Sequence, residues 1–245
     1  IRFSPRMWLR EVDLGAYSVR GAVLLGDDAV VAFDSLSRPC DMAVVEPLLA
    51  GRPLTVVYSH ADWDHVWGTA GLPWGRVVAH EAAVERFGQD VPETLARMRT
   101  EEPGRWDDVV LVPPTDTFRE ELSLDLGGLT LHLRHLPGHT PDSLVGFVPE
   151  EGVLLAGDTV ETPWPCLNEG SPLEEWIREL ARWRGEEAVR LVIPAHGRIG
   201  GRDLVDRTMA YLRALQDGGT LDLPEGTTRF YLDAHRDNLR FARGG

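Results

Sequence analysis

The chain contains no lysine, so all 25 of its basic residues are arginines. This absence excludes any mechanism that uses a lysine as nucleophile, general base or clamp on an anionic substrate. Acidic residues number 39, which leaves a formal net charge of −14 on the 245-residue chain. Because like charges repel at long range, we expect no nucleic-acid partner and no association with anionic membranes.

Long apolar runs and a cysteine framework are also absent. No run approaches the ~20 apolar residues that a membrane-spanning helix needs. The two cysteines, Cys40 and Cys166, do not form the dense pattern of disulfide-stabilised secreted domains. The polar N-terminus shows no signal peptide. The sequence begins at Ile1, so whether a leader precedes it is left open. We therefore predict a cytoplasmic protein, present as a monomer or homodimer.

Short apolar runs alternate with helical patterns, which is typical of a mixed α/β fold. Leu129, Leu131 and Leu133 show the period of two that places alternate residues on one face of a strand. Glycine, proline and aspartate turns separate the runs. We predict strands at Met7–Val12, Ser18–Leu25, Ala29–Phe33, Leu54–Ser59, Arg76–Ala79, Val109–Val112, Leu129–Leu136, Leu144–Val148, Val153–Ala156 and Arg190–Ile193.

Helix signals lie between and after these strands. Ser171 precedes Pro172, which matches a capping serine followed by proline at the first helical position. We expect one domain over residues 1–245, with the helical segment at about 203–245 as part of it. The predicted helices are Asp41–Leu49, Glu81–Phe87, Pro92–Glu101, Pro172–Arg184, Asp203–Leu215 and about Asp233–Phe241.

The strongest chemical signal follows the strand predicted to end at Ser59. Four potential metal ligands stand within six positions: His60, Asp62, Asp64 and His65. Taken alone, the two aspartates could be solvated or could cap a helix start. Taken together, four ionisable groups this close are costly to pack without a partner cation.

Three further candidates share this strand-end context. His139, Asp158 and His196 each come just after a predicted strand, in a turn that contains glycine or proline. A single histidine or aspartate in such a place is usually a turn residue. Ligands commonly gather beyond the carboxyl ends of strands, however, and four coincidences of this kind predict one metal site.

These residues carry a resemblance to a known family. The letters HADWDH at His60–His65 resemble the His-x-His-x-Asp-His motif of the metallo-β-lactamase superfamily, in a variant His-x-Asp-x-Asp-His form. Three more segments resemble its later motifs in the same order: Pro137–Ser143, Ala156–Thr159 and Pro194–Gly197. The resemblance implies an α/β fold (α+β in some schemes), an αββα sandwich of two mixed sheets flanked by helices, with metals at one edge between the sheets.

The resemblance also implies the metal ligands and their chemistry. It implies two divalent metal ions, zinc first and manganese or iron as alternatives, which activate a bridging water as hydroxide and polarise a substrate oxygen. Asp64 would in addition act catalytically by orienting the nucleophile or handling its proton. The ligands implied are His60, Asp62 and His139 for the first metal, Asp64, His65 and His196 for the second, and Asp158 as the bridge.

The chain departs from the family pattern at two positions. Asp142 stands where the family often has glycine, which we interpret as a minor change in a turn. Asp62 stands where the family usually has histidine. A carboxylate is a harder, anionic ligand, so it would lower the effective charge on the first metal and favour manganese or iron, or weaken that site.

We therefore predict a metal-dependent hydrolase that acts on a small-molecule ester, thioester, lactone, lactam or phosphoester. Trp63 and Trp164 stand in loops that should border the site, where they either contact the substrate or take part in ordinary core packing. The alternative is an iron-dependent redox protein, because the motif with a carboxylate at position 62 also resembles flavodiiron-type members of the same fold. A metal-binding module without catalysis is a third hypothesis, which the complete ligand set disfavours.

Overall fold

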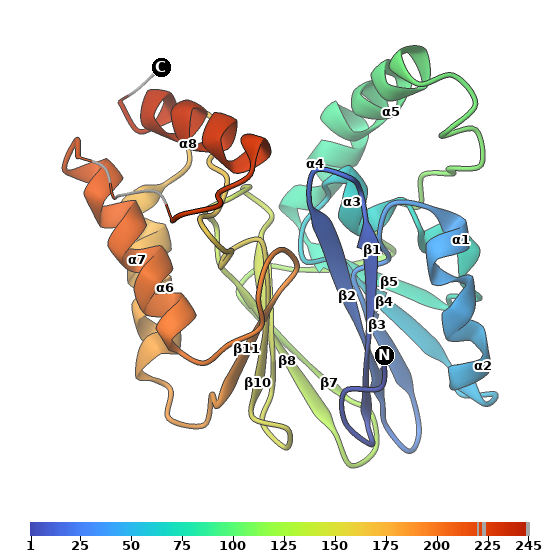
Figure 1. The fold of residues 1–245 in the computed structure, drawn as a ribbon. Helices are drawn as coiled ribbons and strands as arrows, with labels where there is room; N and C mark the ends of the chain where they lie inside the picture. The colour runs from blue at the N-terminus through green and yellow to red at the C-terminus, as the bar shows by residue number, and fades with distance from the viewer. Residues whose placement is uncertain (220, 222–223, 244–245) are drawn as a thin grey trace.

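Two β-sheets pack face to face in the computed structural model, which describes residues 1–219, 221 and 224–243 (Figure 1). The first sheet has six strands in sequence order. Its first three strands are antiparallel and the following ones are parallel. These strands are β1 (Met7–Asp13), β2 (Ser18–Leu25), β3 (Val30–Phe33), β4 (Leu54–Val57), β5 (Arg76–His80) and β6 (Asp116–Phe118).

The second sheet has five strands in the order β11-β10-β9-β8-β7. All neighbours are antiparallel except β10 and β11, which run parallel because a helix joins them. Each sheet is therefore mixed. The strands are β7 (Glu121–Asp125), β8 (Thr130–His135), β9 (Leu144–Val148), β10 (Val153–Gly157) and β11 (Leu191–Pro194).

Helices cover the outer face of each sheet (Figure 1). Beside the first sheet lie α1 (Pro39–Met42), the 3₁₀ turn η1 (Ala43–Val45), α2 (Glu46–Leu49), α3 (Trp63–Val66), the 3₁₀ turn η2 (Thr69–Gly71), α4 (Ala82–Gly88) and α5 (Asp90–Glu101). Beside the second lie α6 (Leu173–Gly185), α7 (Asp203–Gln216) and α8 (Arg229–Phe241). None of the helices that the structure describes is long and apolar enough to span a membrane.

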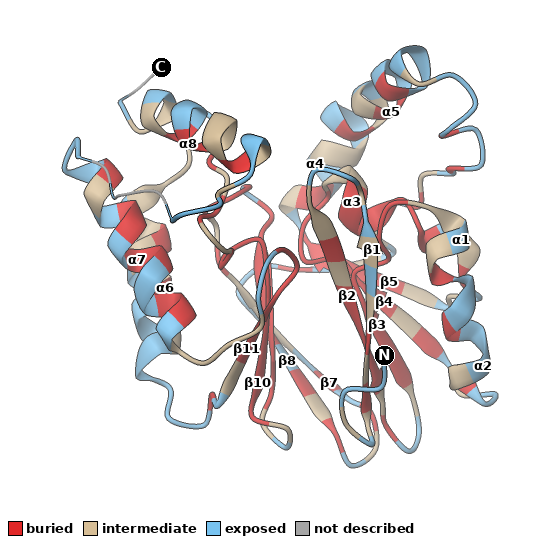
Figure 2. Cartoon of the chain, in the orientation of Figure 1, coloured by how far each residue is buried: buried red, intermediate tan, exposed pale blue. Residues whose placement is uncertain are grey.

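Strand β3 shows how the sandwich buries its side chains. Val31 and Phe33 join the apolar cluster between the sheets, together with Leu131 and Leu133 of β8. The alternate residue Val30 points the other way, into the cluster under the helices of the first sheet. All four residues of β3 are buried, so the strand is covered on both faces (Figure 2).

The predicted αββα sandwich of two mixed sheets is confirmed. The predicted strand at Val109–Val112 is wrong, because this stretch pairs with no strand among the described residues. It packs by its side chains instead: Val109 is buried in the core, and the Val112 carbonyl accepts a hydrogen bond from the Tyr58 hydroxyl at 2.8 Å. Two prolines, Pro113 and Pro114, follow directly and cannot donate to a ladder.

Two strands were missed and one helix is interrupted. Strands β6 and β7 are short and largely polar, so they carry no apolar run, and β7 forms a sheet edge with one face in solvent. The predicted helix Asp41–Leu49 is divided among α1, η1 and α2. Pro47 explains the interruption, because proline has no N–H and belongs in the first turn of a helix, here that of α2.

The C-terminal helices pack against the second sheet. Val205 and Leu212 of α7 share an apolar cluster with Val192 of β11 and with Leu239 and Phe241 of α8. Residues 220, 222–223 and 244–245, which the predicted domain and its C-terminal segment include, lie outside the described residues.

Candidate metal centre

The seven predicted ligands come from strand ends and converge in one place. His60 follows β4, His139 follows β8, His196 follows β11, and Asp158 follows β10. The other three stand at the start of the short helix α3, whose preceding residue, Asp62, is two positions beyond His60. Ligand atoms of all seven fall into three overlapping groups, within each of which the atoms lie no more than 4.8 Å apart.

Asp158 lies at the middle of the cluster. Its carboxylate oxygens lie 3.3 Å from Nε2 of His196 and 3.4 Å from Nε2 of His65. They also lie 3.7 Å from Nε2 of both His60 and His139. One carboxylate therefore faces four imidazoles, which is the arrangement expected of a bridging ligand.

Two further carboxylates flank this centre on opposite sides. Asp62 Oδ2 lies 3.1 Å from Nε2 of His139 and 3.5 Å from Nε2 of His60. Asp62 occupies the position before α3, yet its side chain makes no capping hydrogen bond, so helix capping does not explain it. On the other side, Asp64 lies 3.7 Å from Nε2 of His65 and 3.6 Å from Nε2 of His196.

Backbone carbonyls hold two of the imidazoles in place. His139 donates its Nδ1 hydrogen to the carbonyl of Cys166 at 2.7 Å, and His196 donates to the carbonyl of Ser18 at 2.8 Å. A carbonyl only accepts, so the hydrogen must sit on Nδ1. In the neutral ring Nε2 then keeps its lone pair and points it into the cluster, as in metal-ligating histidines.

Asp34, which sequence reasoning missed, holds the other side of the cluster. Its Oδ2 accepts hydrogen bonds from His65 Nδ1 at 2.9 Å and from the Ser59 hydroxyl at 2.8 Å, while Oδ1 accepts from the Ser59 amide at 2.7 Å. The Ser59 hydroxyl also lies 3.0 Å from Nδ1 of His60. Asp34 follows β3 directly, so the strand-end pattern that identified the other residues would have found it.

Three inward-facing atoms have no hydrogen-bond partner among the described residues. Nε2 of His60, Nε2 of His65 and Oδ1 of Asp158 are buried and make no hydrogen bond. A buried polar atom without a hydrogen bond normally lowers the stability of the folded protein by about 1–3 kcal/mol. Imidazole nitrogens and carboxylate oxygens are also the donors that divalent transition metals take. The donor set therefore fits metal ions.

The cluster attracts positive charge strongly. Burial opposes ionisation of Asp158, but the neighbouring His196, His65 and His60 hold the pKa of that carboxyl well below its usual range. Burial lowers the pKa of His139 and His196, yet the carboxylates outweigh it and raise these pKa values to about 9 and about 10. Protons that are held this way would be exchanged for metal cations.

Asp142 does more than shape a turn, which corrects the interpretation given from sequence. Its side chain is fully buried, and its Oδ2 accepts a hydrogen bond from the backbone amide of Ala61 at 2.8 Å. Its Oδ1 lies 3.0 Å from Nη1 of Arg86. The same guanidinium reaches Asp62 Oδ1 at 2.6 Å, so the two departures from the family motif share one arginine.

A cavity of about 110 Å³ opens onto the cluster. Besides ligand residues it is lined by Tyr17, Trp63, Glu161, Cys166 and Phe230. The ring of Tyr17 lies 4.5 Å from that of Phe230, measured between centroids, and joins the β1–β2 turn to the start of α8. Sequence reasoning missed Tyr17, Glu161 and Phe230 as site residues, and no local pattern marks them.

Of the two tryptophans predicted to border the site, only Trp63 lines this cavity. The ring of Trp164 instead stacks on Tyr211, with centroids 4.7 Å apart, and borders a separate hollow.

Two titratable side chains also face the cavity. Burial raises the pKa of Glu161 to about 7, and the Tyr231 hydroxyl donates a hydrogen bond to Glu161 Oε1 at 2.6 Å. Burial likewise raises the pKa of the Cys166 thiol well above its usual value, so this thiol stays protonated. A thiolate nucleophile at Cys166 is therefore disfavoured.

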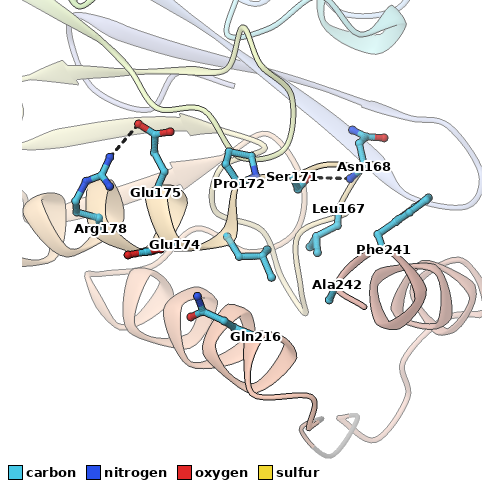
Figure 3. A pocket seen from close by; sticks show the side chains of 11 residues that line it. Leu167, Asn168, Ser171, Pro172, Glu174, Glu175, Arg178, Gln216, Phe241 and Ala242 are labelled. Atoms are coloured by element: carbon cyan, nitrogen blue, oxygen red, sulfur yellow. Dashed lines mark hydrogen bonds and ion pairs between the residues drawn. The ribbon is translucent and has the colours of Figure 1, made fainter. Parts of the chain in front are cut away.

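A larger hollow lies elsewhere in the molecule. A groove of about 570 Å³ runs between the loop before α6 and helices α6, α7 and α8, and Figure 3 shows Asn168, Glu174, Arg178, Gln216 and Phe241 along it. None of the predicted ligands lines it. The chemistry of the smaller cavity, rather than its size, identifies it as the candidate site.

A two-sheet sandwich with a histidine–aspartate cluster at its strand ends has the architecture of a metal-binding α/β protein. The family model for the Metallo-beta-lactamase superfamily matches residues 22–202, and the chain belongs to this superfamily. The resemblance drawn from the four motifs is thereby confirmed.

Named relatives share only part of their length with this chain. The acyl-coenzyme A thioesterase MBLAC2 of Homo sapiens is 31% identical over 121 residues, which is 45% of this chain and 43% of the relative. The linear primary-alkylsulfatase of Pseudomonas sp. (strain ATCC 19151) is 28% identical over 109 residues, 42% of this chain and 20% of the relative. The chain thus matches less than half the length of each of these two proteins.

Among solved structures, a metallo-beta-lactamase family protein from Thermus thermophilus is similar with a TM-score of 0.69 and 23% identity. The match covers 98% of this chain and 90% of that one. This likeness establishes the fold over nearly the whole chain.

Proposed function

We propose that this protein is a metal-dependent hydrolase that uses two divalent metal ions on a small acyl substrate. The observation that carries the proposal is the Asp158 carboxylate among four imidazoles. Inward-facing atoms of Asp158, His60 and His65 have no hydrogen-bond partner among the described residues. Hydrolytic chemistry is supported by the named relatives, a thioesterase and a sulfatase.

The ligands divide into two groups around Asp158. His60, Asp62 and His139 would hold one ion, and Asp64, His65 and His196 the other. Zinc is the ion we expect, because nitrogen and oxygen donors of these types suit it, with manganese or iron as alternatives. Ions held there would supply an activated water and would polarise the substrate's carbonyl oxygen.

Asp64 is the residue to which we assign proton handling. It lines the cavity beside Tyr17. Burial, with the nearby Asp64 and Asp158 carboxylates, raises the pKa of Tyr17, so its hydroxyl stays protonated and can donate to Asp64. A hydrogen bond donated by Tyr17 would orient the Asp64 carboxylate towards the attacking water.

The cavity lining favours an uncharged acyl group over an anionic one. Trp63, Tyr17 and Phe230 supply aromatic surface, and Glu161 supplies a carboxyl group. No arginine is found among the described residues that line the cavity, and the chain has no lysine. We therefore place small esters, thioesters, lactones and lactams ahead of phosphoesters as substrates.

The test combines metal analysis with a substrate panel. We expect the purified protein to hold close to two metal ions per chain, and Asp158→Ala or His65→Ala to lose at least ~100-fold of the esterase activity, because both remove a buried ligand. His132→Ala, an exposed histidine bonded to Ser123, is the matched control and should keep full activity. Absence of bound metal, with activity and thermal stability unaffected by chelators, would contradict the proposal.

A second candidate is an iron-dependent redox protein, favoured by the carboxylate of Asp62 in the first ligand group. A carboxylate oxygen is a harder donor than an imidazole nitrogen, and iron binds well to sites that include such oxygen donors. Iron found by elemental analysis, with an absorption spectrum that changes on reduction and no hydrolysis across the panel, would select this candidate over the hydrolase.

A further inference from the structure

Arg86 of α4 connects three carboxylates beside the metal centre. Its Nη2 lies 2.6 Å from Asp62 Oδ1 and 2.7 Å from Asp90 Oδ2, and its Nη1 lies 3.0 Å from Asp142 Oδ1. The side chain is only 16% exposed, so these contacts are partly shielded from solvent. Asp90 is the outer partner, since about half of its side chain is exposed.

Asp142 fixes this arginine to the ligand loop. Its carboxylate is fully buried and binds Arg86 with one oxygen and the Ala61 amide with the other. Ala61 lies between His60 and Asp62 in the chain. Asp142 therefore ties the backbone of the ligand loop and the guanidinium of Arg86 to the same buried side chain, which limits the movement of both.

Asp62 uses its two oxygens for different purposes. Oδ1 accepts the bond from Arg86, while Oδ2 faces Nε2 of His139 at 3.1 Å. Asp62 makes no capping bond to α3, so α3 does not hold its side chain. Arg86 thus binds Oδ1 of Asp62 and leaves Oδ2 directed towards the histidines.

The charges show why an arginine stands here. A carboxylate in place of the histidine that is usual for the family adds one negative charge to the first ligand group. Arg86 adds one positive charge in direct contact with that carboxylate. Arg86 therefore offsets the charge of Asp62 in a contact that is partly shielded from solvent. It shares this single positive charge with Asp142 and Asp90, so the group as a whole stays negative.

We propose that Arg86 is a positioning residue that makes Asp62 a single-oxygen, charge-compensated metal ligand, with Asp142 as its anchor. This inference rests on the proposed function, because it assigns Asp62 to a metal. It links Asp62 and Asp142, the two departures from the family motif, through one guanidinium.

The experiment measures zinc affinity and stoichiometry by competition with a chromophoric chelator. We expect Arg86→Met to bind one of the two zinc ions about 10- to 100-fold more weakly, the range found when groups behind a metal ligand are removed. Arg86→Lys should be intermediate, because an ammonium cannot make the two-pronged contact with both carboxylates. Arg97→Met is the matched control: Arg97 lines the same small hollow beside Asp62 but pairs with the exposed Glu101, and its affinity should not change.

Arg86→Met leaves Asp142 buried without its cation, which could unfold the protein. The double variant Arg86→Met/Asp142→Gly removes both charges and restores the family's usual glycine, and it should still bind the affected zinc more weakly. Adding Asp62→His to this double variant should recover at least ~10-fold of the affinity, whereas Asp62→His in the wild-type background should not. Such a difference between backgrounds is the signature of coupled residues.

The outcomes separate the two proposals. If the wild-type protein binds no zinc, the proposed function fails. If the wild-type binds two ions and both Arg86→Met and the double variant bind them with wild-type affinity, the role assigned to Arg86 is wrong and the hydrolase proposal stands. Equal affinity of Asp62→His in the two backgrounds would also overturn the link between Arg86 and Asp62.

Discussion

Asp34 owes its role to one backbone angle and three hydrogen bonds. Its φ of 63° lies in the left-handed region, which turns the chain sharply at the end of β3. In this conformation the buried carboxylate reaches His65 and both the amide and hydroxyl of Ser59. Aspartate and asparagine tolerate this region better than most residues do, so the residue type suits both the backbone and the site.

Asp34→Asn tests this role at the scale of one residue. Asparagine keeps the size and tolerates the positive φ, but its uncharged amide orients His65 less strongly. We expect zinc binding to weaken by about 10- to 100-fold, and thermal stability to fall too, because the amide NH2 replaces an oxygen that accepts buried hydrogen bonds. Asp206→Asn, at an exposed ion pair on α7, is the control and should leave affinity unchanged. Wild-type affinity in Asp34→Asn would show that His65 does not depend on this carboxylate.

At the scale of elements, the ends of the chain complete the cavity. Tyr17 lies in the turn between β1 and β2, and Phe230 lies in the first turn of α8. Both lie outside residues 22–202, which the family model matches. The two rings contact each other, and the ring of Tyr17 also lies 5.0 Å from that of the ligand residue His196, measured between centroids. Substrate selection in this chain is therefore expected to depend on segments beyond the shared family core.

Phe230→Ala tests this expectation. Removing aromatic surface that the substrate would contact, and widening the cavity, should raise KM for a small ester about two- to tenfold, since one aromatic contact is worth about 0.5–1.5 kcal/mol. The value of kcat should change less, because the ligand residues are untouched. Phe241→Ala, on the same helix but lining the groove of Figure 3, should leave KM unchanged. A fall in kcat with KM unchanged would contradict a role for Phe230 in substrate binding.

At the scale of the whole molecule, the cluster couples stability to pH and metal. His139 and His196 have pKa values raised to about 9 and about 10 in the folded, metal-free protein. Unfolded histidine titrates near about 6.5, so the folded state binds more protons between about pH 6.5 and 10. This contribution to stability is complete below about pH 6.5 and is lost as the pH rises through about 9 to 10.

We therefore expect the free energy of unfolding of the metal-free protein to fall between about pH 7 and 10. With zinc bound, the histidines are already deprotonated, so this part of the slope should disappear and protons should be released on binding. Denaturant unfolding across this pH range, with and without zinc, measures the difference. Identical slopes in the two forms would contradict the binding of zinc by these histidines.

Much of the fold and the candidate ligands could be predicted from local sequence. Strand β8 alternates leucines and was placed within one residue, because the period of two is visible in a short window. The polar edge strand β7 was not predicted, since hydrogen bonding to β8 rather than an apolar run defines it. The cytoplasmic location, the monomer or homodimer state and the absence of a nucleic-acid partner stay predictions.

The sequence by itself determined the family, the two-sheet architecture and the seven residues that face one another in the cluster. It could do so because each ligand lies within eight positions of the end of a strand, so the ligand motifs are short stretches that can be recognised in the linear sequence. Only the tertiary structure decided which residues contact the ligand side chains and line the cavity. Arg86 is 24 positions from Asp62 and 56 from Asp142, and Tyr17 meets Phe230 across nearly the whole chain. Contacts of this kind depend on how two sheets and their helices pack, which no short window of sequence records.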